Sequence, residues 1–254
     1  MTAFKDRVGE RFISNEGYEF VIIKYNRNDD VWIEFQDEYK ARIHTDYRWC
    51  RQGKVKNPYH PSIYQHGFIG QGEYEAYINK IATEPYRDWY NIMIRGFDKE
   101  FKKKHPTYKD VTVNPEIYNF QDFGIWREHN YYEIEGETMD LDKDILCKGN
   151  KEYSFNTMIY VPQRINKLFI KNDANRGKYP IGVSYRKDND KYIARCQTLD
   201  GRKHLGYYDN PHKAFIAYKE FKEAYIKEVA DEYKDKIPQR LYDAMYNWIV
   251  EEDD

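Results

Sequence analysis

The stretch PIGVSYRKDNDKYIARCQTLDGRKHLGYY, residues 180–208, decides the fold of the C-terminal part of the chain. Residues 181–187, 191–198 and 202–207 have the composition of short β-strands. The KDND and TLDG segments between them combine Asp with Asn or Gly, which tolerate tight turns. A long helical segment follows, from residue 211 to about residue 233. The sequence therefore predicts a three-stranded sheet packed on a helix.

Positive charge is concentrated in this part of the chain. The whole protein has 254 residues and a net charge of −2. Residues 167–213 contain 11 Lys and Arg against 5 Asp, a net charge of +6. Residues 214–254 contain 6 Lys and Arg against 11 Asp and Glu, a net charge of −5. The predicted sheet is therefore basic, and the helical region that follows it is acidic.

Strand geometry predicts where the basic side chains point. Alternate residues of a strand face the same side of a sheet, so Arg186, Arg195 and either Arg202 or Lys203 are expected to share the face opposite the helix. A basic sheet face can enter a DNA groove, where phosphate contacts position it and arginines read base edges. The alternative interpretation is a solvated basic sheet that binds nothing.

Three segments near the N-terminus also have β composition: GYEFVIIKY, VWIEFQ and KARIHTDY, all between residues 8 and 55. Asn and Asp turns separate them, most clearly NRNDD at residues 26–30. They predict a small antiparallel sheet or barrel. A connector rich in Gly, Pro and Tyr follows at residues 53–74.

Helices and a second β region are predicted in the middle of the chain. One helix runs from about residue 84 to residue 105, with Trp89, Met93 and Phe97 on one face, and another covers residues 115–128. We expect their aromatic residues to form a core. The next region, residues 139–169, reads as a strand, a turn at Gly149 and Asn150, a strand and the start of a helix at Gln163.

Several classes of protein are excluded or disfavoured by composition. The N-terminal MTAFKDRVGERF is charged and lacks the apolar core of a secretory signal. No stretch approaches the roughly 18 to 20 apolar residues of a membrane span. Cys50, Cys147 and Cys196 are far apart, which disfavours a disulfide framework and an all-cysteine zinc site. The expectation is a cytoplasmic protein without a membrane partner.

The C-terminal motifs GVSYRK, KYIARC and HLGYYDNPHKAFIAYK, in the order strand, strand, strand, helix, resemble the DNA-binding domain of the APETALA-two or ethylene-response-factor type. In that family the sheet lies in the major groove of DNA. Ser184 and His204 stand where family members have Arg and Trp, so the reading of bases is expected to differ. The resemblance and the charge pattern together imply a DNA-facing set of Arg186, Lys187, Lys191, Arg195, Arg202, Lys203 and His204.

The segment LDKDILCKGNKEYSFNTMIYVPQRIN, residues 141–166, resembles the ββα-metal element of HNH nucleases. The resemblance implies that Asp142 and Asn166 hold one divalent ion such as Mg²⁺, and it places Asn150 in the catalytic loop. Lys143 occupies the position of the general base. A lysine is mostly protonated at pH 7 and accepts no proton unless it is strongly desolvated. If the chain is an enzyme, it is a divalent-metal-dependent DNA endonuclease or nickase with impaired cleavage.

Residues 8–250 as a whole resemble a group of bacteriophage proteins described as HNH-endonuclease-like with this C-terminal module. The motifs that carry the resemblance include VGERFISNEGYE, KVKNPYHPSIY, HPTYKDVTV, YVPQRIN, RGKYPIGV and YIKEVADEYKDKIP. The implied fold class is α+β in three parts: a small β domain with its connector (1–75), an HNH-like ββα domain with flanking helices (76–175), and the sheet with its helices (176–254).

The resemblance implies a double-stranded DNA-binding protein, derived from a homing-like HNH endonuclease, in the cytoplasm of an infected bacterium. The alternative is an anti-defence protein, of the anti-CRISPR kind, that inhibits a host nuclease or CRISPR effector. The missing catalytic histidine and the acidic last 41 residues motivate it, because negative charge can meet a nucleic-acid-binding surface of a partner protein. A phage protein of structural or regulatory role without chemistry is the third interpretation.

Overall fold

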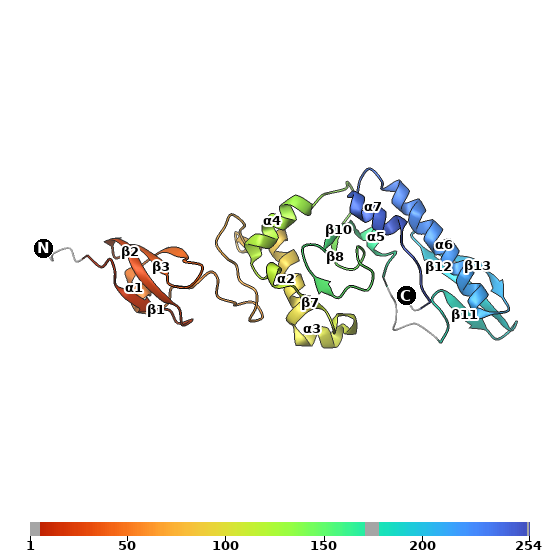
Figure 1. Ribbon diagram of the computed structural model, residues 1–254, viewed down its shortest axis with the longest axis horizontal. Helices are drawn as coiled ribbons and strands as arrows, with labels where there is room; N and C mark the ends of the chain where they lie inside the picture. The colour runs from red at the N-terminus through yellow and green to blue at the C-terminus, as the bar shows by residue number, and fades with distance from the viewer. Residues whose placement is uncertain (1–5, 171–177, 253) are drawn as a thin grey trace. The chain divides into compact units, whose positions relative to one another are not determined.

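The computed structural model describes residues 6–170, 178–252 and 254 (Figure 1). Helices and several small sheets alternate along the chain, which confirms the α+β class. Internal contacts divide the chain into two compact units, residues 1–129 and 130–254, and each is described by itself. The three-part division predicted from the sequence remains a prediction, and its boundary after residue 175 lies outside the described residues.

The first unit begins with a four-stranded antiparallel sheet in the order β1-β2-β3-β4. Its core follows the alternation of a half-buried strand, because Val31, Ile33 and Phe35 are fully buried and the residues between them are not. A short helix that the sequence did not predict follows the sheet, and Asp46 caps it by accepting a hydrogen bond from the Arg48 N–H. These elements are β1 (Arg11–Ile13), β2 (Glu19–Arg27), β3 (Asp30–Phe35), β4 (Arg42–Thr45) and α1 (Tyr47–Arg51).

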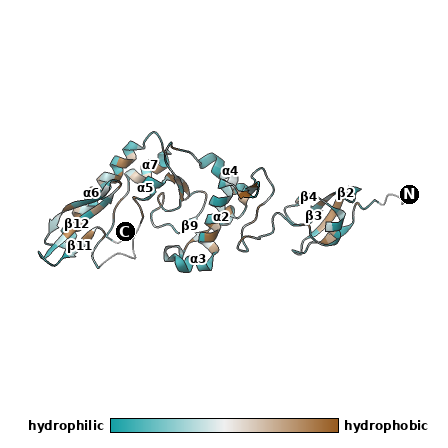
Figure 2. Cartoon of the chain, turned by 180° about the vertical axis from the view of Figure 1, so that it is seen from behind, coloured by the Kyte–Doolittle hydropathy of each residue, from teal (hydrophilic) through white to brown (hydrophobic). Residues whose placement is uncertain are grey.

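The helical part of the first unit packs around α2. Trp89 and Met93 are fully buried, as their spacing predicts, whereas Phe97 is half-buried and stacks on His66 at 4.1 Å between ring centroids. Figure 2 shows hydrophobic residues interspersed with hydrophilic ones along this helix. The elements of this part are β5 (Tyr77–Ile78), β6 (Ile81–Ala82), α2 (Glu84–Phe97), α3 (Lys99–Lys104), β7 (Thr112–Val113) and α4 (Phe120–Asn130).

The single helix predicted over residues 84–105 is wrong, because the chain forms α2 and α3 instead. Asp98 separates them: its backbone is extended, and its side chain accepts a hydrogen bond from the Phe101 N–H at 2.8 Å. A short acidic residue at this position favours a cap over continuation of the helix.

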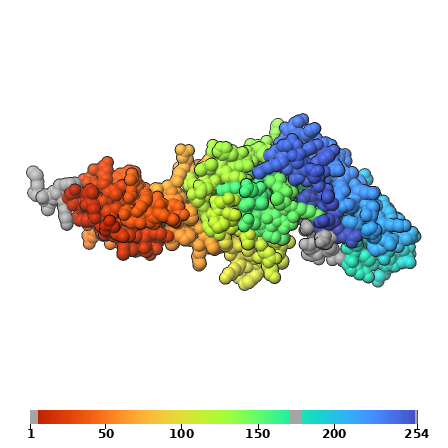
Figure 3. All heavy atoms as spheres, in the orientation of Figure 1, coloured from red at the N-terminus to blue at the C-terminus, as the bar shows by residue number. Residues whose placement is uncertain are grey.

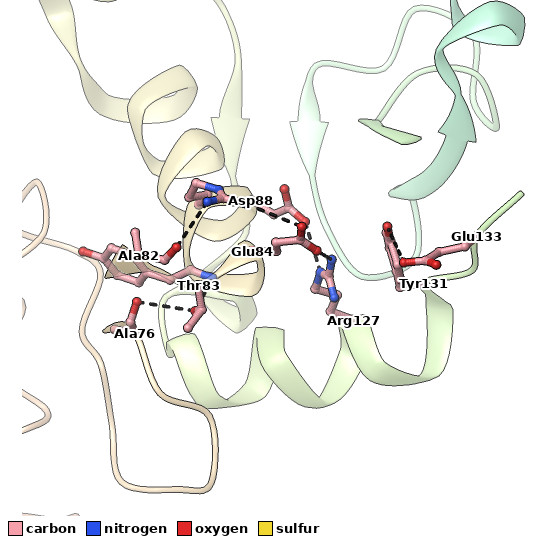
Figure 4. Close-up of polar contacts among 10 residues, drawn as sticks. Ala76, Ala82, Thr83, Glu84, Asp88, Arg127, Tyr131 and Glu133 are labelled. Carbon is pink, nitrogen blue, oxygen red and sulfur yellow. Dashed lines mark hydrogen bonds and ion pairs between the residues drawn. The ribbon is translucent and has the colours of Figure 1, made fainter. Parts of the chain in front are cut away.

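An ion-pair cluster joins α4 to α2 (Figure 4). The Arg127 guanidinium points at two carboxylates of α2, with Nε 3.1 Å from Asp88 Oδ2 and Nη2 3.5 Å from Glu84 Oε2. The Arg127 side chain is only 13% exposed, so these contacts compensate for the hydration that the guanidinium loses on burial.

Thr83 caps the N-terminus of α2 by accepting a hydrogen bond from the Tyr86 N–H.

The second unit contains a strand pair and a three-stranded sheet, each followed by helices. The pair β8 and β10 is antiparallel, with Asp142 opposite Ile159. Gly149 adopts a φ of +80°, as expected of the predicted turn, and α5 begins at Gln163 as predicted. The segment between the two paired strands has 16 residues (143–158). The elements are β8 (Met139–Asp142), β9 (Glu152–Tyr153), β10 (Ile159–Pro162), α5 (Gln163–Asn166), β11 (Val183–Arg186), β12 (Lys191–Thr198), β13 (Gly201–Tyr208), α6 (Pro211–Glu232) and α7 (Gln239–Tyr246).

Helix α6 covers one face of the antiparallel sheet β11-β12-β13. Ala194 and Cys196 of β12 are fully buried, as is Ala214 of α6. Asn210 caps the helix by accepting hydrogen bonds from the N–H groups of the first turn. The sheet and the helix form one continuous body of atoms in the space-filling view (Figure 3).

The other half of α6 belongs to a second core. Ile226 and Val229 of this helix pack in one cluster with Leu241 of α7, Val161 of β10 and Ile165 of α5, all of them at most 1% exposed. The long helix therefore joins the three-stranded sheet to the β8–β10–α5 element within the unit.

At Gly182, the residue before β11, the backbone lies close to Tyr218 of α6. The φ of Gly182 is +76°, and a Cβ there would lie 2.1 Å from the Tyr218 ring. We expect Gly182→Ala to lower the free energy of unfolding by about 2 to 4 kcal/mol through backbone strain and overpacking. Gly136 is the matched control, because its φ is +78° and nothing lies within 4 Å of its Cβ position. Gly136→Ala should cost about 1 kcal/mol. Equal losses in urea unfolding would contradict the close packing.

Candidate functional site

The basic residues of the three-stranded sheet lie mostly on one face. Residues directly opposite each other on paired strands share a face. Arg186 is opposite Lys191, Arg195 is opposite His204, and Gln197 is opposite Arg202. Lys191, Arg195 and Gln197 are also an even number of residues apart along β12, so all three pairs lie on the same side. We call this side the outer face; its basic residues are Arg186, Lys191, Arg195, Arg202 and His204.

Lys203 lies on the other side of the sheet. It is opposite Cys196, which is fully buried beneath α6, and its Nζ is 4.7 Å from the centroid of the Phe221 ring of that helix. The register explains why: Ala194 pairs with Gly206 and Arg195 with His204, so Leu205 is an extra residue in β13, a β-bulge. The sequence did not decide whether Arg202 or Lys203 shares the face of Arg186 and Arg195. The register shows that it is Arg202. Lys187 is exposed in the turn after β11.

Two of the outer-face cations are paired within the protein. Arg186 Nε is 2.7 Å from Asp188 Oδ1, and the arginine hydrogen bond lowers the pKa of the Asp188 carboxyl. Lys191 pairs with Asp209, and its hydrogen bond likewise lowers the pKa of that carboxyl. All four side chains are at least 41% exposed, and such pairs contribute little to stability. They can therefore exchange partners at little cost.

Within the described ranges, the other two strong cations have no such partner. Among the described residues, no carboxylate lies within ion-pair distance of Arg195 or Arg202. A guanidinium without an internal partner keeps its donors for a ligand, and its planar fork suits phosphate oxygens and the base edge of guanine.

Sequence reasoning did not single out Tyr207, which lies on the same face. It is opposite Ile193, its hydroxyl accepts a hydrogen bond from Arg186 Nη1 at 3.2 Å, and its ring contacts that of His204 at 4.8 Å. The ring is 47% exposed and can stack or donate to a ligand. Alternation along β13 could have indicated the face of Tyr207, but the bulge at Leu205 breaks the alternation between Tyr207 and Arg202.

Asp142 ends β8 and is held by the loop that follows. Its Oδ1 accepts hydrogen bonds from the N–H groups of Asp144 at 2.8 Å and Ile145 at 2.7 Å. Burial raises the pKa of this carboxyl to about 6, and the negative charge of Asp144 adds to the effect. Asp142 and Asp144 are neighbouring carboxyls, and the charge of one makes the other harder to ionise. A cation nearby would offset this repulsion.

The other three residues of the predicted HNH-like site have internal partners. Asn166 Nδ2 donates to Asp140 Oδ2 at 3.1 Å, and among the hydrogen bonds of the described residues none joins Asn166 to Asp142. Lys143 is nearly buried, and its Nζ donates to Asp144 Oδ2 at 3.2 Å and to the Asn150 carbonyl at 3.4 Å. Asn150 in turn donates from Nδ2 to the Lys143 carbonyl at 2.7 Å. Lys143 and Asn150 thus hold the loop together, and the Lys143 Nζ is the donor in both of its hydrogen bonds.

The donor set fits a hard divalent ion in part. Asp142, Asp144 and the side-chain carbonyl of Asn166 offer oxygen ligands, which Mg²⁺ prefers, and Mg²⁺ often binds through one or two carboxylates while keeping several waters. Within the described ranges, however, no three His, Cys, Asp or Glu side chains come together as a metal site. The described residues of this element therefore supply two neighbouring carboxylates, fewer than such a cluster has.

Comparison with protein-family models, with curated proteins and with solved structures finds no match for this chain. In the described part of the chain, every helix is too short or too polar to cross a bilayer.

The raised pKa of Asp142 predicts how stability depends on pH. Because its folded pKa of about 6 exceeds the ordinary value of 3.8, the folded state binds more protons, and this group lowers the free energy of unfolding as pH rises from about 4 to about 6. Asp142→Asn keeps the accepting oxygen and removes the charge. We expect it to raise the urea midpoint at pH 7.5 in EDTA and to leave the midpoint near pH 4 unchanged.

The control for this measurement is Asp235→Asn, which changes an exposed carboxylate of the same unit and should leave both midpoints where they are. A lower midpoint for Asp142→Asn at pH 7.5 would mean that the charged carboxylate stabilises the fold, which contradicts a pKa raised by burial. Addition of MgCl₂ should stabilise the wild type more than Asp142→Asn if the two carboxylates bind the ion.

Proposed function

We propose that this chain binds double-stranded DNA with the outer face of its three-stranded sheet. The observation that carries the proposal is the shared face of five basic residues from three strands, two of which, Arg195 and Arg202, have no carboxylate partner among the described residues. A polyanion satisfies these guanidinium groups, and displacement of the exposed acids from Arg186 and Lys191 costs little.

The resemblance to the APETALA-two type of domain gives the docking mode of this proposal. The sheet enters the major groove, phosphates contact the basic rim, and Arg195 and Arg202 reach base edges. Tyr207 and His204 stand beside them and extend the contact surface. Helix α6 packs on the opposite side of the sheet and so faces away from the DNA in this proposal.

The finer fold in this proposal is a small β domain, an HNH-like ββα element and the DNA-binding sheet. The order β8, β10, α5 supports the second of these, since two antiparallel strands followed by a helix are the elements of the ββα-metal arrangement. In it, Asp142 and Asn166 would hold a divalent ion, which when bound stabilises the leaving oxygen of a phosphodiester. Lys143 donates hydrogen bonds at the place of the base, so we propose that cleavage is impaired and binding is the retained function.

From the resemblance to bacteriophage proteins, we propose that the protein acts in the cytoplasm of an infected bacterium. An anti-defence protein that binds a host nuclease or CRISPR effector remains the second candidate. One reason for this second candidate was the acidic C-terminal region. Three of its acids have partners inside the unit: Glu251 and Asp254 contact Lys148, and Glu252 contacts His212. This pairing leaves less negative charge for a partner protein and favours the DNA-binding proposal.

The outer face can be tested with matched variants. We expect Arg195→Gln combined with Arg202→Gln to weaken binding to a duplex of about 20 bp at least about tenfold, because two base contacts are lost. Lys203→Gln, on the opposite side of the sheet, should change affinity less than about threefold. Fluorescence anisotropy between about 50 and about 200 mM KCl measures both.

Two outcomes of this titration would contradict the assignment. One is the absence of wild-type binding at the lowest salt concentration. The other is an equal loss from Lys203→Gln, which would mean that the sheet does not bind through its outer face. Near-UV circular dichroism confirms that each variant is folded.

Cleavage is tested separately on supercoiled plasmid with MgCl₂. We expect the wild type to nick no faster than Asp142→Ala, because Lys143 supplies no proton acceptor. Mg²⁺-dependent nicking by the wild type that Asp142→Ala abolishes would show that another group acts as the base. That result would overturn the impaired-cleavage part of the proposal and leave the binding part to the anisotropy measurement.

A further inference from the structure

A small pocket in the first unit lies between the end of the four-stranded sheet and the connector. Its volume is about 270 Å³, which is at the lower limit for small-molecule sites and large enough for one side chain. Aromatic rings and two acids form its walls: Tyr18, Tyr39, Tyr59 and Phe68 with Asp37 and Glu38.

The aromatic wall is ordered by stacking. The rings of Tyr39 and Tyr59 are parallel within 1°, with centroids 4.1 Å apart, and Phe68 packs against both at 5.9 and 5.7 Å. Tyr39 is nevertheless 45% exposed, so one side of this stack is open to solvent. Rings that are already packed present their faces to a ligand without loss of side-chain freedom.

The acidic part of the wall is fixed by the turn after β3. Asp37 Oδ1 accepts hydrogen bonds from the N–H groups of Tyr39 and Lys40, and its Oδ2 accepts one from Asn57 Nδ2. Glu38 is exposed and has no hydrogen-bond or ion-pair partner among the described residues. The pocket therefore has one fixed carboxylate and one that remains available to a ligand.

The local field is negative. Burial raises the pKa of Tyr39, and nearby Glu38, Asp37 and Asp122 raise it further; Tyr18 shows the same effect from burial, Glu16 and Asp37. Among the described residues, no Lys or Arg lines the pocket. A phosphate would meet this negative charge unfavourably, so nucleic acid is a poor occupant.

We propose that this pocket binds the cationic side chain of an arginine or lysine from a partner polypeptide. Electron-rich ring faces attract cations, and a neighbouring carboxylate adds a charge-assisted hydrogen bond to the same group. The occupant is one side chain rather than a larger ligand because of the pocket volume. None of the residues that line the pocket belongs to the basic sheet face, so this proposal does not depend on whether the chain binds DNA.

The test is an NMR titration of the full chain with the capped peptide acetyl-Gly-Arg-Gly-amide, and with the same peptide carrying citrulline, the neutral isostere of arginine. We expect saturable shifts of the Tyr39 and Tyr59 amides with the arginine peptide, at dissociation constants in the millimolar range, and at least about threefold weaker binding of the citrulline peptide. A lysine peptide and its norleucine counterpart form the second pair.

Variants locate the binding in the pocket. Glu38→Gln and Tyr39→Leu should each weaken the arginine peptide at least about threefold, while Glu75→Gln, which changes an exposed carboxylate elsewhere in the unit, should leave it unchanged. Glu38 is a surface side chain, so its variant remains informative if Tyr39→Leu disturbs the fold. Equal binding of arginine and citrulline peptides, no saturable shift up to about 20 mM, or shifts of these amides with duplex DNA instead would each overturn the proposal.

Discussion

The packing of α6 on the three-stranded sheet is the constraint on which the second unit depends. At Gly182 the backbone approaches the Tyr218 ring so closely that no side chain fits between them, and α6 contacts all three strands of the sheet. The covered side holds Ala194 and Cys196, and the other side is left to the charged residues of the same strands. The basic face is therefore a consequence of where the helix packs, since β-strands place alternate residues on opposite sides.

Much of the fold could be predicted from the sequence because local signals agreed. The three C-terminal strands and the helix beginning at Pro211 lie within two residues of their predicted bounds, since Asp and Gly turns and the Asn210 cap mark their ends. Prediction was wrong where one residue could act in two ways. Asp98 reads as a polar helix residue, but it caps a new helix.

The candidate site was less predictable, because it depends on register and on long-range contacts. Sequence alternation could not decide between Arg202 and Lys203, since the bulge at Leu205 changes the pairing of β13 by one residue. Asn166 was expected beside Asp142, but it bonds Asp140, two residues earlier on the same strand. The aromatic pocket was also missed, because it combines residues from the sheet and the connector that have no sequence spacing in common.

The two exposed acids beside Arg186 and Lys191 have a kinetic consequence. In the proposed complex, a polyanion would first contact Arg195 and Arg202, which have no carboxylate partner among the described residues, and would engage Arg186 and Lys191 by displacing Asp188 and Asp209. These carboxylates remain tethered nearby and compete again whenever a contact opens. Such intramolecular competition would shorten the lifetime of loosely held complexes, so the proposed binding would favour rapid sampling of many positions along a charged polymer over prolonged residence at any one of them.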